Sequence, residues 1–422
     1  MTSDARVVTT AVWARWAPAL RSRNFRLFWL GQLVSVVGTS VQVVAEGYLI
    51  YEITRSTFWL GMVGLLGLLP VLPISLVGGL LIDRFPRRKL ILVTQIGLLI
   101  QAAIFGVLAA SGQLRLWQII ALYFVFGSLL AVDHPARRAF LVELVSSEDL
   151  ANAVALNATV FNFSSLIGYA LAGVMIAAVG AGATILFNAA TYLAPVIALM
   201  LLRVADVSAD AAPSVATRNG TRPGGSRALA EGLLTLLRQP AILATISLMA
   251  VVGGLAYPVF GMMPAFAQDV LHTDAVGLGL LLSAGALGSV VGTVVMARVG
   301  RHARGATLAL SSLALPALVA SFAGARSLWL ACALLVGVGA VLLVVQSMAI
   351  TLVQLNIADR VRGRVMSVYS LLHAGSDTMG NVAIGSVAVW IGLPWALAAG
   401  AGLALLYATG LALALPSLRR LE

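Results

Sequence analysis

The sequence predicts an all-α membrane protein with twelve transmembrane helices in two pseudo-symmetric bundles of six. Of its 422 residues, 60% are hydrophobic and only 10% are charged, a composition too apolar for a soluble domain of this length. Apolar runs of about 20 residues recur along the chain, and each is long enough to cross the roughly 30 Å hydrocarbon core of a bilayer. Short clusters of Arg, Gly, Pro and Asp separate these runs.

The apolar runs place twelve spans. We expect them at residues 27–50, 57–82, 90–110, 115–133, 154–178, 181–202, 241–267, 275–297, 305–324, 327–350, 366–390 and 393–415. The first run extends beyond 20 residues and has no small-residue cleavage site after it, so we expect a membrane span rather than a cleaved signal peptide.

The basic residues indicate the orientation of the spans. With twelve spans, 24 of the 27 Lys and Arg residues fall on the side of the two termini, and only Arg55, Arg115 and Arg326 fall on the other. Basic loops stay in the cytoplasm, so both termini are predicted to be cytoplasmic. The net charge of +11 is then explained by loops at an anionic leaflet, and we expect no nucleic-acid partner.

The chain divides near its middle. We expect a cytoplasmic N-tail (1–26), a six-helix bundle (27–202), a cytoplasmic linker with a short amphipathic helix (203–240), a second bundle (241–415) and a cytoplasmic C-tail (416–422). Glycines repeat between the halves: Gly168 and Gly173 match Gly380 and Gly385, in both cases 212 residues apart. Such spacing favours a duplication, and these glycines favour close helix packing. Duplicated halves place a substrate path between them.

A polar stripe runs through the first span. Gln32, Ser35, Thr39, Gln42 and Glu46 follow one another at gaps of 3, 4, 3 and 4, which puts them on one helix face. A charge in mid-membrane costs roughly 2.5–3.5 kcal/mol on insertion scales, so we expect the stripe to line a watery cavity. Glu46 is then a candidate proton carrier; the alternative is a buried, hydrogen-bonded glutamate.

Two other spans carry polar stripes. Ser370, His373, Asp377 and Asn381 share a face of the eleventh span, where His373 and Asp377 are further candidates for proton coupling. A static His–Asp pair is the alternative for them. Asn381 and a weaker stripe in the fifth span complete the predicted substrate cavity; the stripe consists of Asn162, Ser165 and Tyr169.

Several segments resemble a known family. GGLLIDRFPRRKLIL (78–92) resembles the loop signature between spans two and three of the major facilitator superfamily. DHPARRAFLVELVSSEDLANAVALN (133–157) is similar to the segment after span four in bacterial exporters related to the enterobactin exporter. MMPAFAQDV, GLGLLLSAGALGSVVG and DRVRGRVMSVYSL resemble the second half of that group. The similarity covers nearly the whole chain.

The resemblance implies a proton-coupled exporter of small molecules that rocks its two halves, a monomer in the bacterial inner membrane with no cofactor. It also implies a conformational latch at the cytoplasmic side, for which a solvated charge cluster is the alternative. The latch residues are Gly79, Asp83, Arg84, Arg87, Arg88 and Arg364. Three positions depart from the family pattern: Pro86 stands in place of a glycine, Tyr169 in place of a proline, and Met296 in place of an acid.

Other functional classes fit the sequence poorly. The only lysine, Lys89, is not in a glycine-rich phosphate loop, which argues against an ATP-driven pump. The four histidines are scattered and Cys332 is the only cysteine, so we expect neither a metal site nor a disulfide. No nucleophile motif frames Ser370 and His373, so an enzyme is not expected. A lipid or lysolipid transporter or scramblase, and a non-transporting membrane sensor, remain alternatives.

Overall fold

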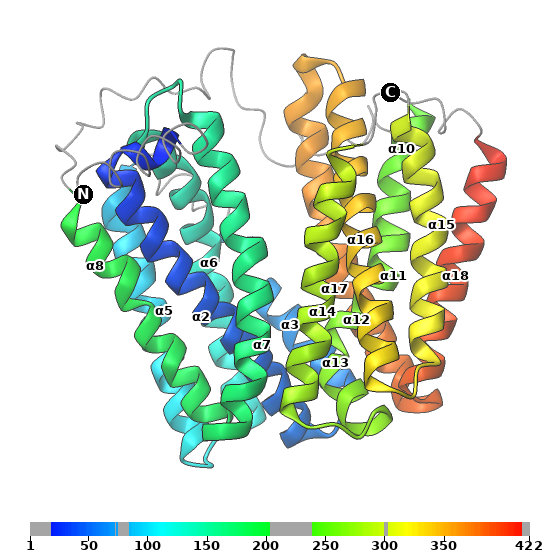
Figure 1. Ribbon diagram of the computed structural model, residues 1–422, viewed down its shortest axis with the longest axis horizontal. Helices are drawn as coiled ribbons and strands as arrows, with labels where there is room; N and C mark the ends of the chain where they lie inside the picture. Colours follow the sequence, from blue (N-terminus) through cyan, green and yellow to red (C-terminus); the bar gives the residue numbers. More distant parts are fainter. Residues whose placement is uncertain (1–17, 72, 75–83, 203–238, 299–302, 416–422) are drawn as a thin grey trace, which may run out of the picture. The chain divides into compact units, whose positions relative to one another are not determined.

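The computed structural model describes residues 18–71, 73–74, 84–202, 239–298 and 303–415. The predicted tails lie wholly or largely outside this range, as does the linker up to residue 238. The same holds for Gly79 and Asp83 of the predicted latch. The described part of the chain is helical throughout (Figure 1).

The helices follow one another through both halves of the sequence. The first half contains η1 (Pro18–Arg21), α2 (Arg23–Thr54), α3 (Thr57–Leu68), α5 (Arg87–Ala110), α6 (Leu116–Leu144), α7 (Leu150–Thr191) and α8 (Leu193–Leu201). The second half begins with short pieces: α10 (Pro240–Leu248), η2 (Met249–Gly253), α11 (Gly254–Ala256), α12 (Pro258–Gly261), α13 (Met263–Ala265) and η3 (Phe266–Val270). It continues with α14 (Ala275–Met296), α15 (Arg304–Ala323), α16 (Leu328–Asn356), α17 (Asp359–Ile391) and α18 (Leu393–Ala414).

Within the described residues, nine helical stretches are long and apolar enough to span a membrane. One of them, Leu150–Leu201, is 52 residues long and bends at Gly180, whose φ of 81° and ψ of 162° suit a residue without a Cβ. It therefore holds two predicted spans. The short α3 and the more polar α17 lie in the two remaining predicted spans, and the predicted span 57–82 is described only as far as residue 74, with residue 72 left out. The predicted all-helical membrane fold is confirmed.

Two helices extend furthest beyond their predicted spans. α6 runs to Leu144 and α17 starts at Asp359, whereas the sequence analysis ended span four at residue 133 and began span eleven at 366. Hydropathy marks where the hydrocarbon ends, but charged residues such as Arg and Glu are good helix formers. A helix can therefore continue into water past the end of its apolar run.

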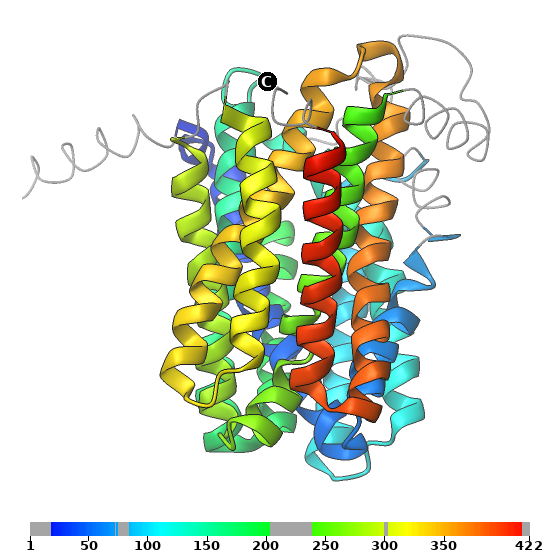
Figure 2. The same ribbon diagram turned by 90° about the vertical axis from the view of Figure 1, so that its right-hand side faces the viewer.

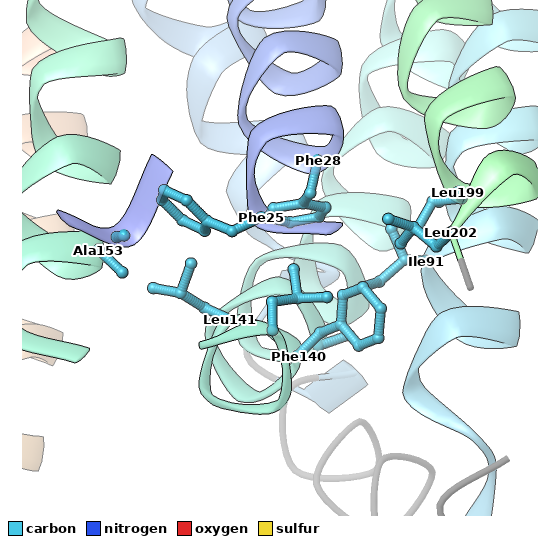
Figure 3. Close-up of a cluster of buried hydrophobic side chains, with 11 residues drawn as sticks. Phe25, Phe28, Ile91, Phe140, Leu141, Ala153, Leu199 and Leu202 are labelled. Atoms are coloured by element: carbon cyan, nitrogen blue, oxygen red, sulfur yellow. The ribbon is translucent and has the colours of Figure 1, made fainter. Parts of the chain in front are cut away.

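Contacts divide the chain into two compact units, one comprising 1–49 and 66–213 and the other 50–65 and 214–422. One end of the first unit is held by an aromatic and aliphatic cluster, whose side chains point toward one another in Figure 3. Phe28 and Phe140 meet edge to face with ring centroids 5.6 Å apart. The cluster joins the starts of α2 and α5 to the ends of α6 and α8, as expected for spans that alternate in direction.

The second unit relies on close helix contacts. α14 packs on α16, and α18 packs on α15 and α17 (Figure 2). A Cβ added at Gly288 would collide with the carbonyl oxygen of Val336, so no larger residue fits at this position between α14 and α16. The first span of this unit is broken by the π-helical turns η2 and η3, a feature frequent at functional sites.

Residues 50–65 group with the second unit through polar contacts, although the sequence analysis placed them in the first bundle. Thr57 Oγ1 donates a hydrogen bond to the carbonyl oxygen of Gly385 at 2.8 Å. Arg55 donates to Gln268 Oε1 at 2.9 Å, and the Tyr51 hydroxyl donates to Asp269.

The four duplicated glycines lie at or near helix contacts. A Cβ at Gly168 would come within 2.5 Å of Ser40, and Gly173 on the same helix is buried. In the second unit, a Cβ at Gly380 would collide with the carbonyl oxygen of Gly254, and one at Gly385 would lie 2.5 Å from that of Thr57. Both contacts are with backbone atoms, which cannot move aside as a flexible side chain can.

Candidate functional site

The first unit contains a cavity of about 390 Å³. Five of the predicted substrate-cavity residues line it: Gln32, Ser35, Thr39, Ser165 and Tyr169. Aromatic and aliphatic side chains complete the walls, among them Leu98, Phe126, Leu130, Phe161 and Tyr192. The cavity thus combines an apolar surface with a few polar groups, which is typical of small-molecule sites.

The cavity lies toward one end of the first unit. Its lining includes Gln32 near the start of α2, Arg138 near the end of α6 and Asn157 near the start of α7. The charged residues of the lining all come from the last part of α6: Asp133, His134, Arg137 and Arg138.

Asp133 is the centre of a buried polar network that the sequence analysis missed. It is 1% exposed, and its Oδ1 accepts hydrogen bonds from Thr94 Oγ1 at 2.7 Å and Gln95 Nε2 at 3.0 Å. Arg137 Nε donates to Oδ2 at 2.5 Å. These bonds compensate the burial of the carboxylate. The adjacent polar pair Thr94–Gln95 within an apolar run was the signal that could have indicated a partner in α6.

The α2 stripe divides between two environments. Gln32, Ser35 and Thr39 line the cavity, and the Thr39 and Tyr192 hydroxyls are hydrogen-bonded at 3.1 Å. Gln42 and Glu46 instead lie outside the cavity lining, packed inside the unit. The reason for the difference is that α7 covers this part of the stripe and offers its own amide side chain, Asn188.

Glu46 ends a chain of hydrogen bonds. Thr191 Oγ1 donates to Asn188 Oδ1 at 2.7 Å, Asn188 Nδ2 donates to Gln42 Oε1, and Gln42 Nε2 donates to Glu46 Oε1 at 2.6 Å. The Tyr123 hydroxyl, from α6, is also hydrogen-bonded to Glu46. The carboxyl group is only 3% exposed. Every link of this chain points its donor toward the glutamate, which is therefore held as an acceptor.

In the second unit, α17 carries the other predicted carboxylate. Asp377 Oδ2 lies 3.6 Å from His373 Nδ1, one turn earlier. Asn381 Nδ2 donates to the backbone oxygen of Asp377 at 2.8 Å. Among the described residues, no hydrogen bond reaches Asp377 Oδ1, His373 Nδ1 or Asn381 Oδ1, although all three atoms are buried. Ser370, the first residue of the stripe, is exposed.

The described latch residues make varied contacts. Arg87 forms an ion pair with Glu143 of α6, and Arg88 donates to the backbone oxygen of Met200 at 3.4 Å. Arg84 is exposed, and Arg364 is half-buried in α17. For Asn162, the structure places only the backbone, in α7. Among the described residues, no group of three or more His, Cys, Asp or Glu side chains could hold a metal ion.

Comparison with known proteins places the chain in a family. The profile of the transmembrane secretion effectors matches residues 13–422. The chain belongs to this family. It is a transporter of the major facilitator superfamily and not an enzyme, as the sequence analysis predicted.

The relatives of this chain include exporters. The enterobactin exporter EntS of Citrobacter koseri is 26% identical over 375 residues, which cover 86% of this chain and 85% of that protein. EntS of Escherichia coli O81 is 26% identical over 394 residues, covering 90% and 89%. These similarities confirm the predicted resemblance to bacterial exporters and indicate a multi-pass protein of the inner membrane.

Solved transporter structures share the fold of this secretion effector. A bacterial homologue of the human lysosomal transporter Spinster, in an inward-facing and unoccupied conformation, has a TM-score of 0.66 and 14% identity, with 95% of this chain and 96% of that chain covered. The nucleoside transporter NupG has a TM-score of 0.68 and 12% identity, with 92% and 98% covered. At these identities, the likeness establishes the fold alone.

Proposed function

We propose that this secretion effector exports small amphipathic or hydrophobic molecules, of the drug or siderophore type, in exchange for protons by alternating access. The observation that carries the proposal is the pairing of the cavity with a buried carboxyl group on the same helix. Thr39 lines the cavity, and Glu46 lies seven residues, about two helical turns, further along α2. Because both lie on α2, substrate binding in the cavity and proton binding at Glu46 can influence each other.

The polar–apolar character of the cavity supports the substrate class. Aromatic walls bind the apolar body of a ligand, while Gln32, Ser35 and Thr39 offer hydrogen bonds that orient it. The relatives' role in enterobactin export supports the outward direction and the siderophore alternative.

Purified protein in liposomes tests this function. We expect an acidic lumen to drive the accumulation of radiolabelled enterobactin, because a proton leaving the lumen would be exchanged for an entering substrate. Accumulation should exceed that in protein-free liposomes and collapse when a protonophore dissipates the gradient. Protein-dependent equilibration that ignores the gradient would contradict proton coupling and favour a scramblase-like activity.

Both termini are proposed to be cytoplasmic, on the strength of the basic-residue asymmetry. In a background in which Cys332 is replaced by Ala, we expect Asn219→Cys to react with a membrane-impermeant maleimide only in opened cells. His272→Cys should react in intact cells. Labelling of both positions from the same side would exclude the proposed orientation.

A further inference from the structure

We propose that the cavity of the first unit is a site for an amphipathic anion, with Arg138 binding the negative group and the aromatic walls binding the apolar body. The inference deepens the proposed function by naming the substrate class, and it rests on that function only for the transport of the bound molecule. The binding site itself is argued from the charges and walls of the cavity.

The charges of the cavity lining leave a positive excess. Asp133 is the only acid among the lining residues, and its carboxylate is engaged by Arg137 as well as by Thr94 and Gln95. The Asp133–Arg137 pair is therefore neutral as a unit. Arg138 remains, with no carboxylate of the cavity lining left to pair with it.

Arg138 is available to a ligand. It is exposed and lines the cavity, and among the residues that the structure describes none forms an ion pair with it. His134 lies four residues earlier on the same face of α6. The planar guanidinium group presents a fork of N–H donors that matches a carboxylate or phosphate, so it suits this role better than an isolated ammonium group.

The cavity is poorly suited to a cationic ligand. The carboxylate that would bind a cation already accepts bonds from three side chains at 2.5–3.0 Å. A cationic ligand would have to displace Arg137 and would meet Arg138 nearby. A neutral ligand would make no charge-assisted hydrogen bond to Arg138, whereas an anion would.

The apolar walls define the rest of the ligand. Phe126 and Leu130 precede the charged residues on α6, and Phe161 and Tyr169 line the cavity from α7. An anion with an aromatic or acyl body fits this combination, because the body buries apolar surface while its charged group reaches Arg138. Two sources share this chemistry: a soluble aromatic acid and an anionic lipid.

Binding of a matched set of probes tests the inference. We would measure binding of radiolabelled 2-naphthoate to the purified protein in phosphatidylcholine nanodiscs, with empty nanodiscs as the background. Its methyl ester and the corresponding naphthylmethyl-trimethylammonium cation serve as neutral and positive competitors. We expect the anion to bind about tenfold more tightly than either, because only the anion makes charge-assisted hydrogen bonds to Arg138.

Variants assign the preference to one side chain. Arg138→Gln should abolish the roughly tenfold preference for the anion while leaving ester binding unchanged. Arg138→Lys should retain most of it. The matched control is Arg298→Gln, which removes an exposed arginine of the second unit and should bind as the wild type does. Including phosphatidylglycerol in the nanodiscs separates the soluble acid from the anionic lipid. If phosphatidylglycerol reduces the binding of naphthoate, an anionic lipid is the ligand. If the binding of naphthoate is undiminished, the ligand is a soluble acid.

The inference is overturned by any of three results: equal binding of all three probes, preference for the cation, or an undiminished anion preference in Arg138→Gln. Failure to bind any probe would count against it equally. These outcomes are separate from a failure of the proposed transport function. If only the proposed transport function fails, the anion still binds through Arg138, but a proton gradient does not move any substrate.

Discussion

Replacing Asp133 by Asn is expected to destabilise the protein by about 3–5 kcal/mol, because the change leaves Arg137 as a poorly compensated charge in a largely buried site. The side chains of Arg137 and Asp133 are only 12% and 2% exposed. Thr94 and Gln95 can still donate to the oxygen of the new amide, but the NH₂ group of that amide would face another donor, Arg137 Nε. Thermal unfolding in a single detergent, followed by intrinsic fluorescence, measures the effect.

A second ion pair on α6 supplies the matched control. Glu143 pairs with Arg87 of α5, but these side chains are 26% and 27% exposed, so Glu143→Gln should cost only about 0–1 kcal/mol. The double variant Asp133→Asn/Arg137→Gln removes both charges and should recover much of the lost stability. If Asp133→Asn unfolds at the same temperature as Glu143→Gln, the buried pair does not stabilise the first unit.

The fold could be predicted from the sequence because the bilayer restricts the length and the backbone hydrogen bonding of every span. Hydropathy located the apolar helices, since each membrane span needs about 20 apolar residues and must satisfy its own backbone. The same rules say nothing of the helix ends in water. That is why the extensions of α6 to Leu144 and of α17 back to Asp359 were missed.

Helical periodicity predicted part of the candidate site. It grouped Gln32, Ser35 and Thr39 on one face, and all three line the cavity, but it could not show that α7 would cover Gln42 and Glu46 with Asn188. That depends on packing between helices separated by more than 100 residues. The Asp133 network was missed for the same reason: its partners Thr94 and Gln95 lie on a different helix, and spacing within one helix carries no information about them.

The most consequential variant for transport is Glu46→Gln, which we expect to abolish gradient-driven accumulation while preserving substrate binding and exchange. The hypothesis is that Glu46 carries the coupled proton. Its carboxyl group is buried and accepts the hydrogen bond at the end of the Thr191–Asn188–Gln42 chain. Protonation turns one of its oxygens from an acceptor into a donor and removes the charge, which weakens the bond from Gln42 at the end of the chain that joins α2 to α7. Proton binding can thereby be linked to movement of these helices.

Asp377→Asn is the rival variant, since Asp377 lies beside His373 on α17 and has a buried oxygen without a hydrogen-bond partner among the described residues. Gln42→Ala is a second control. It breaks the chain of hydrogen bonds but leaves the carboxyl group, so it should weaken coupling without removing the proton carrier.

The liposome assay separates these possibilities when uphill accumulation and exchange at equal pH are measured on the same preparation. Glu46→Gln keeps the shape of the side chain and, like the protonated glutamate, carries no charge, so exchange of labelled for unlabelled enterobactin should continue. Accumulation driven by an acidic lumen should fall to the level of protein-free liposomes. If the variant still accumulates enterobactin and still responds to the pH gradient, Glu46 is not the carrier. Loss of accumulation in Asp377→Asn alone would then assign the proton to the His373–Asp377 pair.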